Sequence, residues 1–430
     1  MQHEDIYRLF VENGQTVTTD SRVCPAGAIF FALKGEKFNG NKFAAKALEN
    51  GCSYAVVDEA EYCLSERCIL VDNALTALQQ VAHLHRVRLA TPVVGITGTN
   101  GKTTTKELTA AVLGRKYNVL YTEGNLNNHI GVPLTLLRLR PEHQMAVVEM
   151  GANHPGEIKA LAAIASPDAG LITNVGKAHL EGFGSFEGVI STKCELYENL
   201  MRRGGTIFAD AANPYLMPAL DGYKPVTYGV GCTEADVCGR VERCAPFVTL
   251  SWWTEAAGKH CVDTHFIGAY NAQNMLAAIA VGLHYGVTPE EIDAALSEYE
   301  PKNNRSQLVR TGRNTLIVDA YNANPTSMEA AINNFRMMDG GHKVLILGDM
   351  LELGSQSEEE HARVVQLVRG GGFDDALFVG GEFARTAQGY RTFADVAQLR
   401  DWLADNRIDG ATVLIKGSHG IGLQSIIDLF

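Results

Sequence analysis

Hydrophobic and polar positions alternate along this chain with two different periods. Short β-branched runs are followed by longer stretches in which apolar residues recur every three or four positions. The first kind of run predicts a buried strand, and the second predicts an amphipathic helix. Because strands and helices follow each other in turn over most of the length, the pattern favours an α/β fold built on parallel sheets.

The same pattern divides the chain into three parts. Residues 1–90 give a short strand and helix series, residues 91–302 a longer one, and residues 303–430 the signals of a doubly wound parallel sheet. The polar, helix-breaking segment 301–304 marks the second boundary. A chain of 430 residues that is 46% hydrophobic is also too long for one ordinary core. We therefore expect a small N-terminal α/β domain, a central domain with a parallel sheet, and a C-terminal α/β domain.

Composition excludes several classes of protein. The formal net charge of -12 argues against nucleic acid as a partner, and no apolar run is long enough to span a bilayer. The first residues lack the basic segment of a secretory signal. The 9 cysteines include no C-x-x-C pair, which fits reduced thiols better than a disulfide framework. We expect a cytoplasmic protein without membrane insertion.

A glycine-rich loop separates a predicted strand from a predicted helix. Segment 95–105 is Gly-Ile-Thr-Gly-Thr-Asn-Gly-Lys-Thr-Thr-Thr. Such a loop presents backbone N–H groups to an anion, and its glycines let a phosphate approach closely. Lys102 would contact the β- and γ-phosphates and Thr103 a magnesium ion, although Ile96 stands where the strict P-loop pattern has its first glycine. A plain turn without a ligand would leave the Gly-Lys-Thr-Thr run unexplained. The residues expected at the nucleotide are Gly98, Thr99, Asn100, Gly101, Lys102, Thr103 and Thr104.

Further candidates follow in the central part. Glu149 ends a buried run, where a nucleotide-bound metal needs a carboxylate. His179 is a candidate metal ligand. The commoner role of a histidine in a loop is to form hydrogen bonds within that loop. Lys193 is predicted in the first turn of a helix, where the dipole would lower its pKa, and a neutral amine can form a carbamate with carbon dioxide. Asn271 and Asn274 share one helical face and could reach a base or ribose.

Polar clusters also stand at strand ends of the outer domains. Ser21, Arg22 and Lys34 could hold a diphosphate, the alternative being a surface salt bridge for Arg22 and a solvated Lys34. Ligands bind beyond the carboxyl ends of parallel strands, so the C-terminal clusters should face one crevice. These clusters are residues 319–325, 348–354 and 416–419.

Three sequence blocks together resemble the Mur ligase family over essentially the whole chain. They are Gly-Thr-Asn-Gly-Lys-Thr-Thr at 98–104, Ala-His-Leu-Glu-Gly-Phe-Gly-Ser at 178–185 and Asp-Ala-Tyr-Asn-Ala-Asn-Pro at 319–325. The first block alone is also similar to folylpolyglutamate synthetases. The loop 124–128, Gly-Asn-Leu-Asn-Asn, together with the third block is most similar to the family members that add D-alanyl-D-alanine.

The resemblance implies an ATP-dependent amide ligase of peptidoglycan synthesis, active in the cytoplasm as a monomer. With ATP and Mg²⁺, it would phosphorylate the terminal carboxylate of a UDP-N-acetylmuramoyl tripeptide. The amine of D-alanyl-D-alanine would then attack the acyl phosphate. Residues 1–90 would bind the UDP-sugar, the central P-loop domain ATP, and the C-terminal Rossmann-like domain the dipeptide.

The resemblance also implies roles for single residues. Lys102 would stabilise the migrating phosphoryl charge, and Thr103 with Glu149 would hold one magnesium. His179 and a carbamylated Lys193 would hold or orient a second. Arg305 would reach the nucleotide from the hinge between domains, with catalytic effect. The other expected nucleotide contacts are Asn271, Asn274 and Asp319. The expected substrate contacts are Ser21, Arg22, Lys34, Asn125, Asn127, Asn128, Tyr321, Asn322 and Asn324.

Some positions depart from the family pattern, and some alternatives stay open. The family often has glycine where this chain has Cys194, arginine where it has His419, and Asp-Gly-His at 39–41, here Asn-Gly-Asn. A tripeptide-forming Mur ligase or a folylpolyglutamate synthetase would share much of the chemistry. A P-loop kinase or ATPase would lack the third domain. A non-catalytic nucleotide-binding regulator would not need the Glu149 carboxylate as a metal ligand. The sequence does not distinguish diaminopimelate from lysine in the tripeptide.

Overall fold

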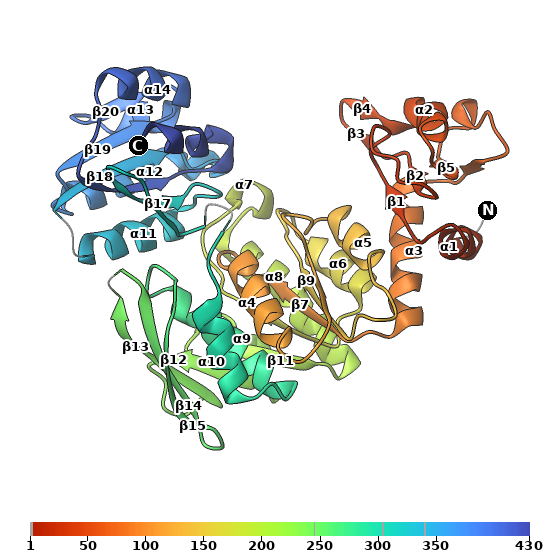
Figure 1. The fold of residues 1–430 in the computed structure, drawn as a ribbon, viewed down its shortest axis with the longest axis horizontal. Helices are drawn as coiled ribbons and strands as arrows, with labels where there is room; N and C mark the ends of the chain where they lie inside the picture. The colour runs from red at the N-terminus through yellow and green to blue at the C-terminus, as the bar shows by residue number, and fades with distance from the viewer. Residues whose placement is uncertain (1–2, 245, 303–304, 339–340) are drawn as a thin grey trace.

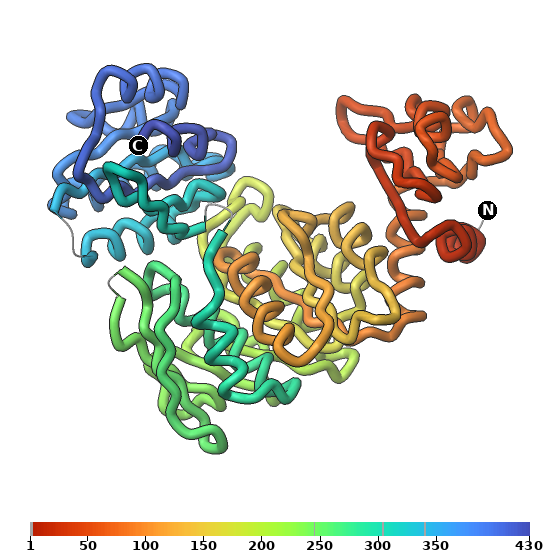
Figure 2. Tube along the Cα trace, viewed as in Figure 1, coloured from red at the N-terminus to blue at the C-terminus, as the bar shows by residue number. Residues whose placement is uncertain are grey.

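The computed structural model describes residues 3–244, 246–302, 305–338 and 341–430, arranged as three α/β domains (Figure 1). Each domain is built on its own main sheet, of four, nine and six strands in chain order. The predicted fold class is therefore confirmed. The N-terminal and C-terminal domains lie at opposite ends of the long axis, with the central domain between them (Figure 2).

The N-terminal domain has a parallel sheet in the order β1-β2-β5-β6 and a short β3–β4 hairpin. Asn73 begins its longest helix by accepting a hydrogen bond from the Thr76 N–H. The strands are β1 (Val17–Thr18), β2 (Ile29–Phe31), β3 (Lys34–Gly35), β4 (Phe38–Asn39), β5 (Tyr54–Val57) and β6 (Cys68–Leu70); the helices are α1 (His3–Glu12), α2 (Ala44–Glu49) and α3 (Ala74–Leu89), with 3-10 turns η1 (Gly40–Phe43) and η2 (Ala60–Tyr62).

The central sheet has the order β15-β14-β13-β12-β11-β10-β7-β9-β8, parallel from β8 to β13 and antiparallel over its last two strands. Its strands are β7 (Val93–Thr97), β8 (Val119–Tyr121), β9 (Met145–Glu149), β10 (Ala169–Ile172), β11 (Thr206–Asp210), β12 (Val226–Val230), β13 (Val237–Cys244), β14 (Val248–Thr254) and β15 (Gly258–Asp263). Its helices are α4 (Lys102–Leu113), α5 (Gly131–Leu136), α6 (Glu157–Ala165), α7 (Leu180–Phe183), α8 (Phe186–Arg203), α9 (Asn271–His284), α10 (Pro289–Glu298) and the 3-10 turn η3 (Met217–Leu220).

The C-terminal sheet has the order β16-β17-β21-β18-β19-β20 and is parallel except at β16. Its strands are β16 (Gln307–Arg310), β17 (Thr315–Asp319), β18 (His342–Gly348), β19 (Asp375–Val379), β20 (Arg391–Phe393) and β21 (Ala411–Lys416). Its helices are α11 (Pro325–Met337), α12 (Ser357–Arg369), α13 (Gly381–Thr386) and α14 (Val396–Asp405), with 3-10 turns η4 (Gly354–Gln356), η5 (His419–Ile421) and η6 (Leu423–Leu429).

The first expected domain boundary coincides with a link between two elements. The one after residue 90 lies between the end of α3 at Leu89 and the start of β7 at Val93. The one after residue 302 stays a prediction, because residues 303–304 lie outside the described residues. Within the described ranges, none of the helices has both the length and the apolar character needed to cross a membrane.

Candidate active site

Two glycines of the loop between β7 and α4 are required by close neighbours and by backbone conformation. Gly98 has φ +142°, and a Cβ there would lie 2.0 Å from Thr173 Oγ1. Gly101 has φ +78°, and its Cβ would lie 2.5 Å from Asn274 Oδ1. Only glycine fits either position without displacing these groups. The loop is thus pressed against β10 and α9, and it leads directly into the N-terminus of α4.

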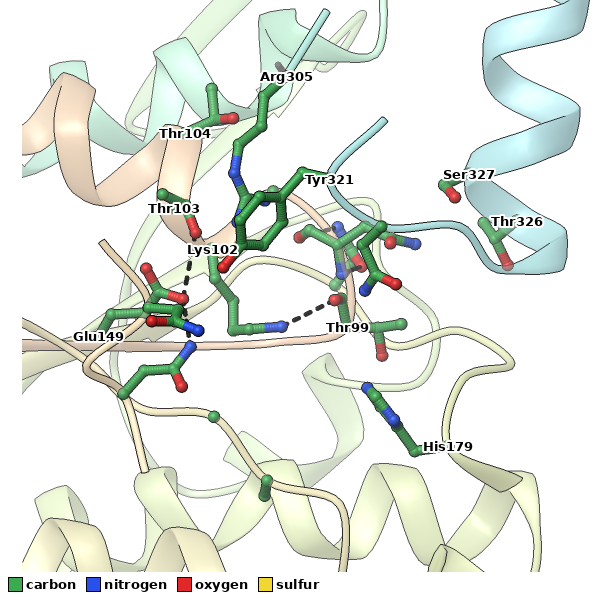
Figure 3. A pocket seen from close by; sticks show the side chains of 18 of the residues that line it. Thr99, Lys102, Thr103, Thr104, Glu149, His179, Arg305, Tyr321, Thr326 and Ser327 are labelled. Atoms are coloured by element: carbon green, nitrogen blue, oxygen red, sulfur yellow. Dashed lines mark hydrogen bonds between the residues drawn. The ribbon is translucent and has the colours of Figure 1, made fainter. Parts of the chain in front are cut away.

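A cavity of about 720 Å³ opens at this loop, between the central and C-terminal domains (Figure 3). The clusters that follow β17, β18 and β21 all reach it, through Asp319, Glu352 and Lys416 among others. The structure thus brings together most of the residues predicted from the sequence. Those that line the cavity are Thr99, Asn100, Gly101, Lys102, Thr103, Thr104, Asn125, Asn127, Asn128, Glu149, His179, Asn271, Asn274, Arg305, Asp319, Tyr321 and Asn322.

The Lys102 side chain lies along its own loop. Its Nζ donates to the carbonyl oxygens of Gly98 at 2.8 Å and Thr99 at 2.9 Å, and Figure 3 shows the ammonium in the middle of the cavity wall. Burial lowers the pKa of Lys102 to about 8, against the opposing effect of the Glu149 carboxylate. An anionic ligand would favour the charged form, so the site is suited to a phosphate.

Thr103 and Glu149 offer hard oxygen ligands side by side. The Thr103 hydroxyl donates to Glu149 Oε1 at 3.2 Å, and Asn127 Nδ2 donates to the same oxygen at 2.8 Å. Glu149 is buried, and its other oxygen, Oε2, has no hydrogen-bond partner in the described structure. A buried carboxylate oxygen without a partner is unusual, and it fits a Mg²⁺ ion.

Mg²⁺ usually takes few protein ligands and completes its shell with water and phosphate oxygens. The residues that the structure describes include no group of three or more His, Cys, Asp or Glu side chains placed to hold a metal.

His179 is paired with the C-terminal domain. Its Nδ1 contacts a carboxylate oxygen of Glu352, and both residues have left-handed backbone conformations, with φ +50° and +64°. Burial lowers the pKa of His179, while the Glu352 carboxylate opposes that shift. Glu352 had no assigned role beyond its cluster, because nothing in the sequence shows which strand-end acid meets a histidine of another domain.

Lys193 lies in the middle of α8, so the expectation that it occupies a first turn is wrong. The Ser185 side chain accepts from the Gly188 N–H and starts the helix at Phe186. Lys193 is buried, and its Nζ donates to the Ala152 carbonyl at 3.3 Å. Burial, and secondly the positive charge of Lys102, lowers its pKa to about 7. The predicted pKa shift therefore has a different cause.

Asn271 and Asn274 brace the glycine-rich loop from α9. Asn274 Nδ2 donates to Asn271 Oδ1 at 2.9 Å, and Asn271 Nδ2 donates to the Ile267 carbonyl at 2.8 Å. The Thr105 hydroxyl donates to Asn274 Oδ1 at 3.1 Å. Both amides are buried at the cavity wall, so they hold α4 and α9 together at the place where a nucleotide would lie.

The C-terminal residues at the cavity hold each other. The Arg305 guanidinium lies 3.8 Å from the centre of the Tyr321 ring. Lys416 Nζ donates to Asp319 Oδ2 at 2.6 Å and to the Asn322 carbonyl at 3.1 Å. Asn324 does not line the cavity but caps α11 and bonds to Asn100. Further residues line the cavity for which the sequence carries no recognisable signal, among them Asn174, Gln273, Thr326 and Ser327.

The predicted residues of the N-terminal domain do not reach this cavity. Arg22 forms an exposed ion pair with Asp20 at 2.7 Å. Lys34 pairs with Asp58 at 3.1 Å and also with Glu59. The carbonyl of Ser21 accepts a hydrogen bond from Asn50. In this conformation the surface salt bridge expected as the alternative for Arg22 is present, and a diphosphate would have to displace the carboxylates from both cations.

Family models cover most of the chain. The model described as "Mur ligase family, catalytic domain" matches residues 15–86. "Mur ligase middle domain" matches residues 96–282, and "Mur ligase, glutamate ligase domain" matches residues 304–419. The three matches follow one another in the order of the three sheets.

Full-length relatives agree with these matches. The UDP-N-acetylmuramoyl-tripeptide–D-alanyl-D-alanine ligase of Bacillus subtilis is 36% identical over 424 residues, which cover 96% of this chain and 92% of the relative. A crystal structure of MurF from Acinetobacter baumannii is 32% identical, with a TM-score of 0.87 over 96% of this chain and 93% of that chain. MurF ligase from Thermotoga maritima, solved in complex with ADP, is 25% identical, with a TM-score of 0.87 over 96% of both chains. This chain belongs to the Mur ligase family.

Proposed function

We propose that this Mur ligase joins D-alanyl-D-alanine to UDP-N-acetylmuramoyl-tripeptide at the expense of ATP, in peptidoglycan synthesis. The observation that carries the proposal is the single cavity where the glycine-rich loop with Lys102 meets the polar strand ends of the C-terminal domain. The full-length similarity to ligases named for this reaction supports it. Because the proposed reaction uses a UDP-linked substrate and ATP, we expect it to take place in the cytoplasm.

The chemistry requires activation of a carboxylate. A carboxylate oxygen is a poor leaving group, so amide formation needs an intermediate in which that oxygen leaves as phosphate. In the first step the tripeptide's terminal carboxylate attacks the γ-phosphorus of ATP, and the bond to the β–γ bridging oxygen breaks, giving an acyl phosphate and ADP. In the second step the uncharged amine of the dipeptide attacks the acyl carbon, and inorganic phosphate leaves as the amine gives up a proton.

Lys102 is the residue placed for the first step. Its ammonium stands at the cavity wall beside the glycine-rich loop, where it donates to the Gly98 carbonyl, so it would neutralise charge on the migrating phosphoryl group. A Mg²⁺ ion, when bound, would neutralise phosphate charge and orient the phosphoryl oxygens. Thr103 and Glu149 would hold that ion. Arg305, stacked on Tyr321 at the entrance to the C-terminal domain, would add a second cation on the nucleotide.

Lys193 and His179 both lie close enough to Lys102 for its positive charge to lower their pKa. Lys193 is a buried amine with a single weak acceptor, and its lowered pKa leaves much of it neutral at physiological pH. We infer that it is carbamylated in the working enzyme, because a carbamate would give this buried position an anion facing the positive charge of Lys102. His179 and the carbamate would then hold or orient a second magnesium.

The substrates would approach from both sides of the loop. Asn125, Asn127 and Asn128 lie on the central side of the cavity and would contact the tripeptide. Tyr321 and Asn322 lie on the C-terminal side and would contact the dipeptide, and Asp319 would contact the ribose of ATP. Ser21, Arg22 and Lys34 would bind the uridine diphosphate end on the N-terminal domain. The enzyme would act as a monomer.

An isotope experiment tests the proposed reaction. UDP-N-acetylmuramoyl-tripeptide carrying ¹⁸O in its terminal carboxylate is incubated with ATP, Mg²⁺ and D-alanyl-D-alanine. The proposal requires a pentapeptide product and one ¹⁸O in the released phosphate. Unlabelled phosphate would exclude the acyl phosphate. Phosphate release without dipeptide, at the rate seen with it, would indicate an ATPase. Parallel reactions with diaminopimelate and lysine tripeptides would identify the third residue.

A further inference from the structure

Two asparagine side chains from different domains bond to each other next to the nucleotide loop. Asn324 Nδ2 donates to Asn100 Oδ1 at 2.7 Å, and Asn100 Nδ2 donates back to Asn324 Oδ1 at 3.3 Å. Asn100 lies in the glycine-rich loop immediately before Gly101, and Asn324 precedes α11 of the C-terminal domain. Asn324 is only 4% exposed, so the amides meet where water competes little.

The orientation of this pair follows from the cap of α11. Asn324 Oδ1 accepts from the Ser327 N–H at 2.9 Å, and the Asn324 N–H donates to Ser327 Oγ at 3.0 Å. This capping box fixes which end of the Asn324 amide is oxygen, because only oxygen can accept the Ser327 N–H. The amide nitrogen must then point to Asn100, which has to present its oxygen. The start of α11 therefore sets which end of the Asn100 side-chain amide, in the nucleotide loop, faces Asn324.

The backbone of Asn100 is held independently. Its N–H donates to Asn174 Oδ1 at 2.9 Å, and its carbonyl accepts from the Thr173 hydroxyl at 2.6 Å. These contacts lie within the central domain and persist whatever the position of the C-terminal domain. The side chain of Asn100, in contrast, gains its two bonds to Asn324 only when α11 lies against the loop.

We propose that Asn324 is a positioning residue for the nucleotide loop and not a dipeptide contact. When the C-terminal domain docks, Asn324 fixes the Asn100 side chain and stiffens the loop ahead of Gly101 and Lys102. When the domain is undocked, the loop loses that support and should hold a nucleotide less well. This inference rests on the proposed function, because it assigns Asn324 to the ATP half of that reaction.

Serine at position 324 separates the two roles of the side chain. Serine is a good N-cap but is too short to reach Asn100, whereas alanine provides neither cap nor bridge. The variants are Asn324→Ser, Asn324→Ala, Asn100→Ala and the double variant Asn100→Ala/Asn324→Ser. The control is Asn334→Ala, which removes another contact between α11 and the central domain, the 3.4 Å hydrogen bond from Cys244 Sγ, away from the loop.

The measurements are ADP affinity by calorimetry and steady-state constants for ATP and dipeptide. We expect Asn324→Ser to weaken ADP binding and raise KM for ATP by about tenfold, with the dipeptide KM changed by less than about twofold. The double variant should be no worse than Asn100→Ala alone, because both changes remove the same pair of bonds. Asn334→Ala should match the unchanged enzyme.

Contrary results are specific. A raised dipeptide KM with normal ADP affinity in Asn324→Ser would assign Asn324 to the dipeptide instead. Additive losses in the double variant would show that the two asparagines act independently. If Asn324→Ser has normal constants while Asn324→Ala binds ADP more weakly, the contribution of Asn324 would be limited to capping α11. A wild-type protein that binds ADP but forms no pentapeptide would refute the proposed function, while the ADP affinities would still test the asparagine pair.

Discussion

The central domain meets its two neighbours in different ways. On the N-terminal side, α3 packs against α5 and α6 of the central domain, and α1 packs against α3. One continuous hydrophobic cluster holds side chains of both domains, from Ile6 and Leu78 to Val148 and Leu196. On the C-terminal side, the hydrophobic clusters consist almost entirely of residues after 305, with Ile267 as the buried residue from the central domain. We call the N-terminal interface the apolar joint and the C-terminal interface the polar joint. Polar pairs cross the polar joint: Asn100 with Asn324, Lys177 with Glu360, His179 with Glu352, and Tyr270 with Ser306.

Because of this difference, the two interfaces should differ in how easily they open. Burial of one leucine contributes about 1.5–3 kcal/mol, so a shared apolar core is costly to open. A hydrogen bond that water can replace contributes about 0.5–1.5 kcal/mol, so a polar joint can close around ligands and open again. The cavity lies at the polar joint. We therefore expect the N-terminal domain to be a fixed part of the central body and the C-terminal domain to be the moving part, which would also shield an acyl phosphate from water.

The largest expected effect is at the polar joint and concerns turnover. Lys102→Ala should reduce kcat by at least about a hundredfold, because it removes a cation from the developing phosphoryl charge. The thermal midpoint should change little, since the hydrogen bonds that Lys102 makes to described residues go to carbonyls of its own loop. Initial rates and a thermal melt on the same preparation test this. Near-normal turnover in a well-folded variant would remove Lys102 from the mechanism.

At the apolar joint the expected effect is on stability. Leu78→Ala in α3 removes a fully buried side chain from the shared cluster, and such changes cost about 2–5 kcal/mol. The matched control on the same helix is Val87→Ala, where the side chain is 52% exposed and little should change. Denaturant unfolding measures both. A separate early transition for the N-terminal domain in Leu78→Ala would contradict the fixed-body interpretation, because it would show that the two domains unfold independently.

An intermediate effect is expected at Lys193. Lys193→Ala should be slow, and a short carboxylic acid in the medium should restore part of the rate by replacing the carbamate oxygens. The pKa of about 7 gives the pH dependence a sign: the neutral amine that reacts with carbon dioxide predominates above pH 7 and is lost below it. Activity of the unchanged enzyme should therefore fall in bicarbonate-free buffer, and more so at pH 6 than at pH 8. Full activity in Lys193→Ala would exclude the carbamate.

Sequence alone predicted the parts of the site that follow from topology. The glycine-rich loop, Glu149 and the strand ends at Asp319 and Lys416 meet at one cavity because the carboxyl ends of parallel strands lie at the same edge of each sheet. Helix α1 was not predicted, although Ile6, Tyr7 and Phe10 are buried on one of its faces. A single amphipathic helix of ten residues gives a weak signal next to strong strand patterns.

The rest of the site depends on how domains dock, which periodicity does not encode. The pairing of His179 with Glu352 and of Asn100 with Asn324 joins residues more than 170 positions apart in separately folded domains. Helix starts were also misjudged where a cap lay upstream: Ser185 begins α8 well before Lys193. The lowered pKa of Lys193 was thus predicted for the wrong reason, because burial causes it and not the helix dipole.

The smallest expected effect comes from one ion pair at the polar joint. Lys177 Nζ lies 2.7 Å from Glu360 Oε1, and the lysine side chain is 45% exposed while the glutamate is 3% exposed. A half-exposed pair is worth about 1 kcal/mol or less, so Lys177→Ala should lower kcat/KM for the dipeptide by no more than about fivefold. The loss should become smaller near 1 M salt, where the screening length is about 3 Å.

A matched ion pair inside the central domain makes this last test specific to the joint. Arg115 and Glu298 also lie 2.7 Å apart, but both belong to the central domain, so Arg115→Ala should leave kcat/KM unchanged at any salt concentration. Small-angle scattering with an ATP analogue and UDP-tripeptide should show a more compact particle for the unchanged enzyme, and slightly weaker compaction for Lys177→Ala at low salt. A loss near a hundredfold, or one that high salt does not reduce at all, would mean that Lys177 contacts the substrates directly. Identical scattering for the free and fully liganded enzyme would mean that the polar joint does not move.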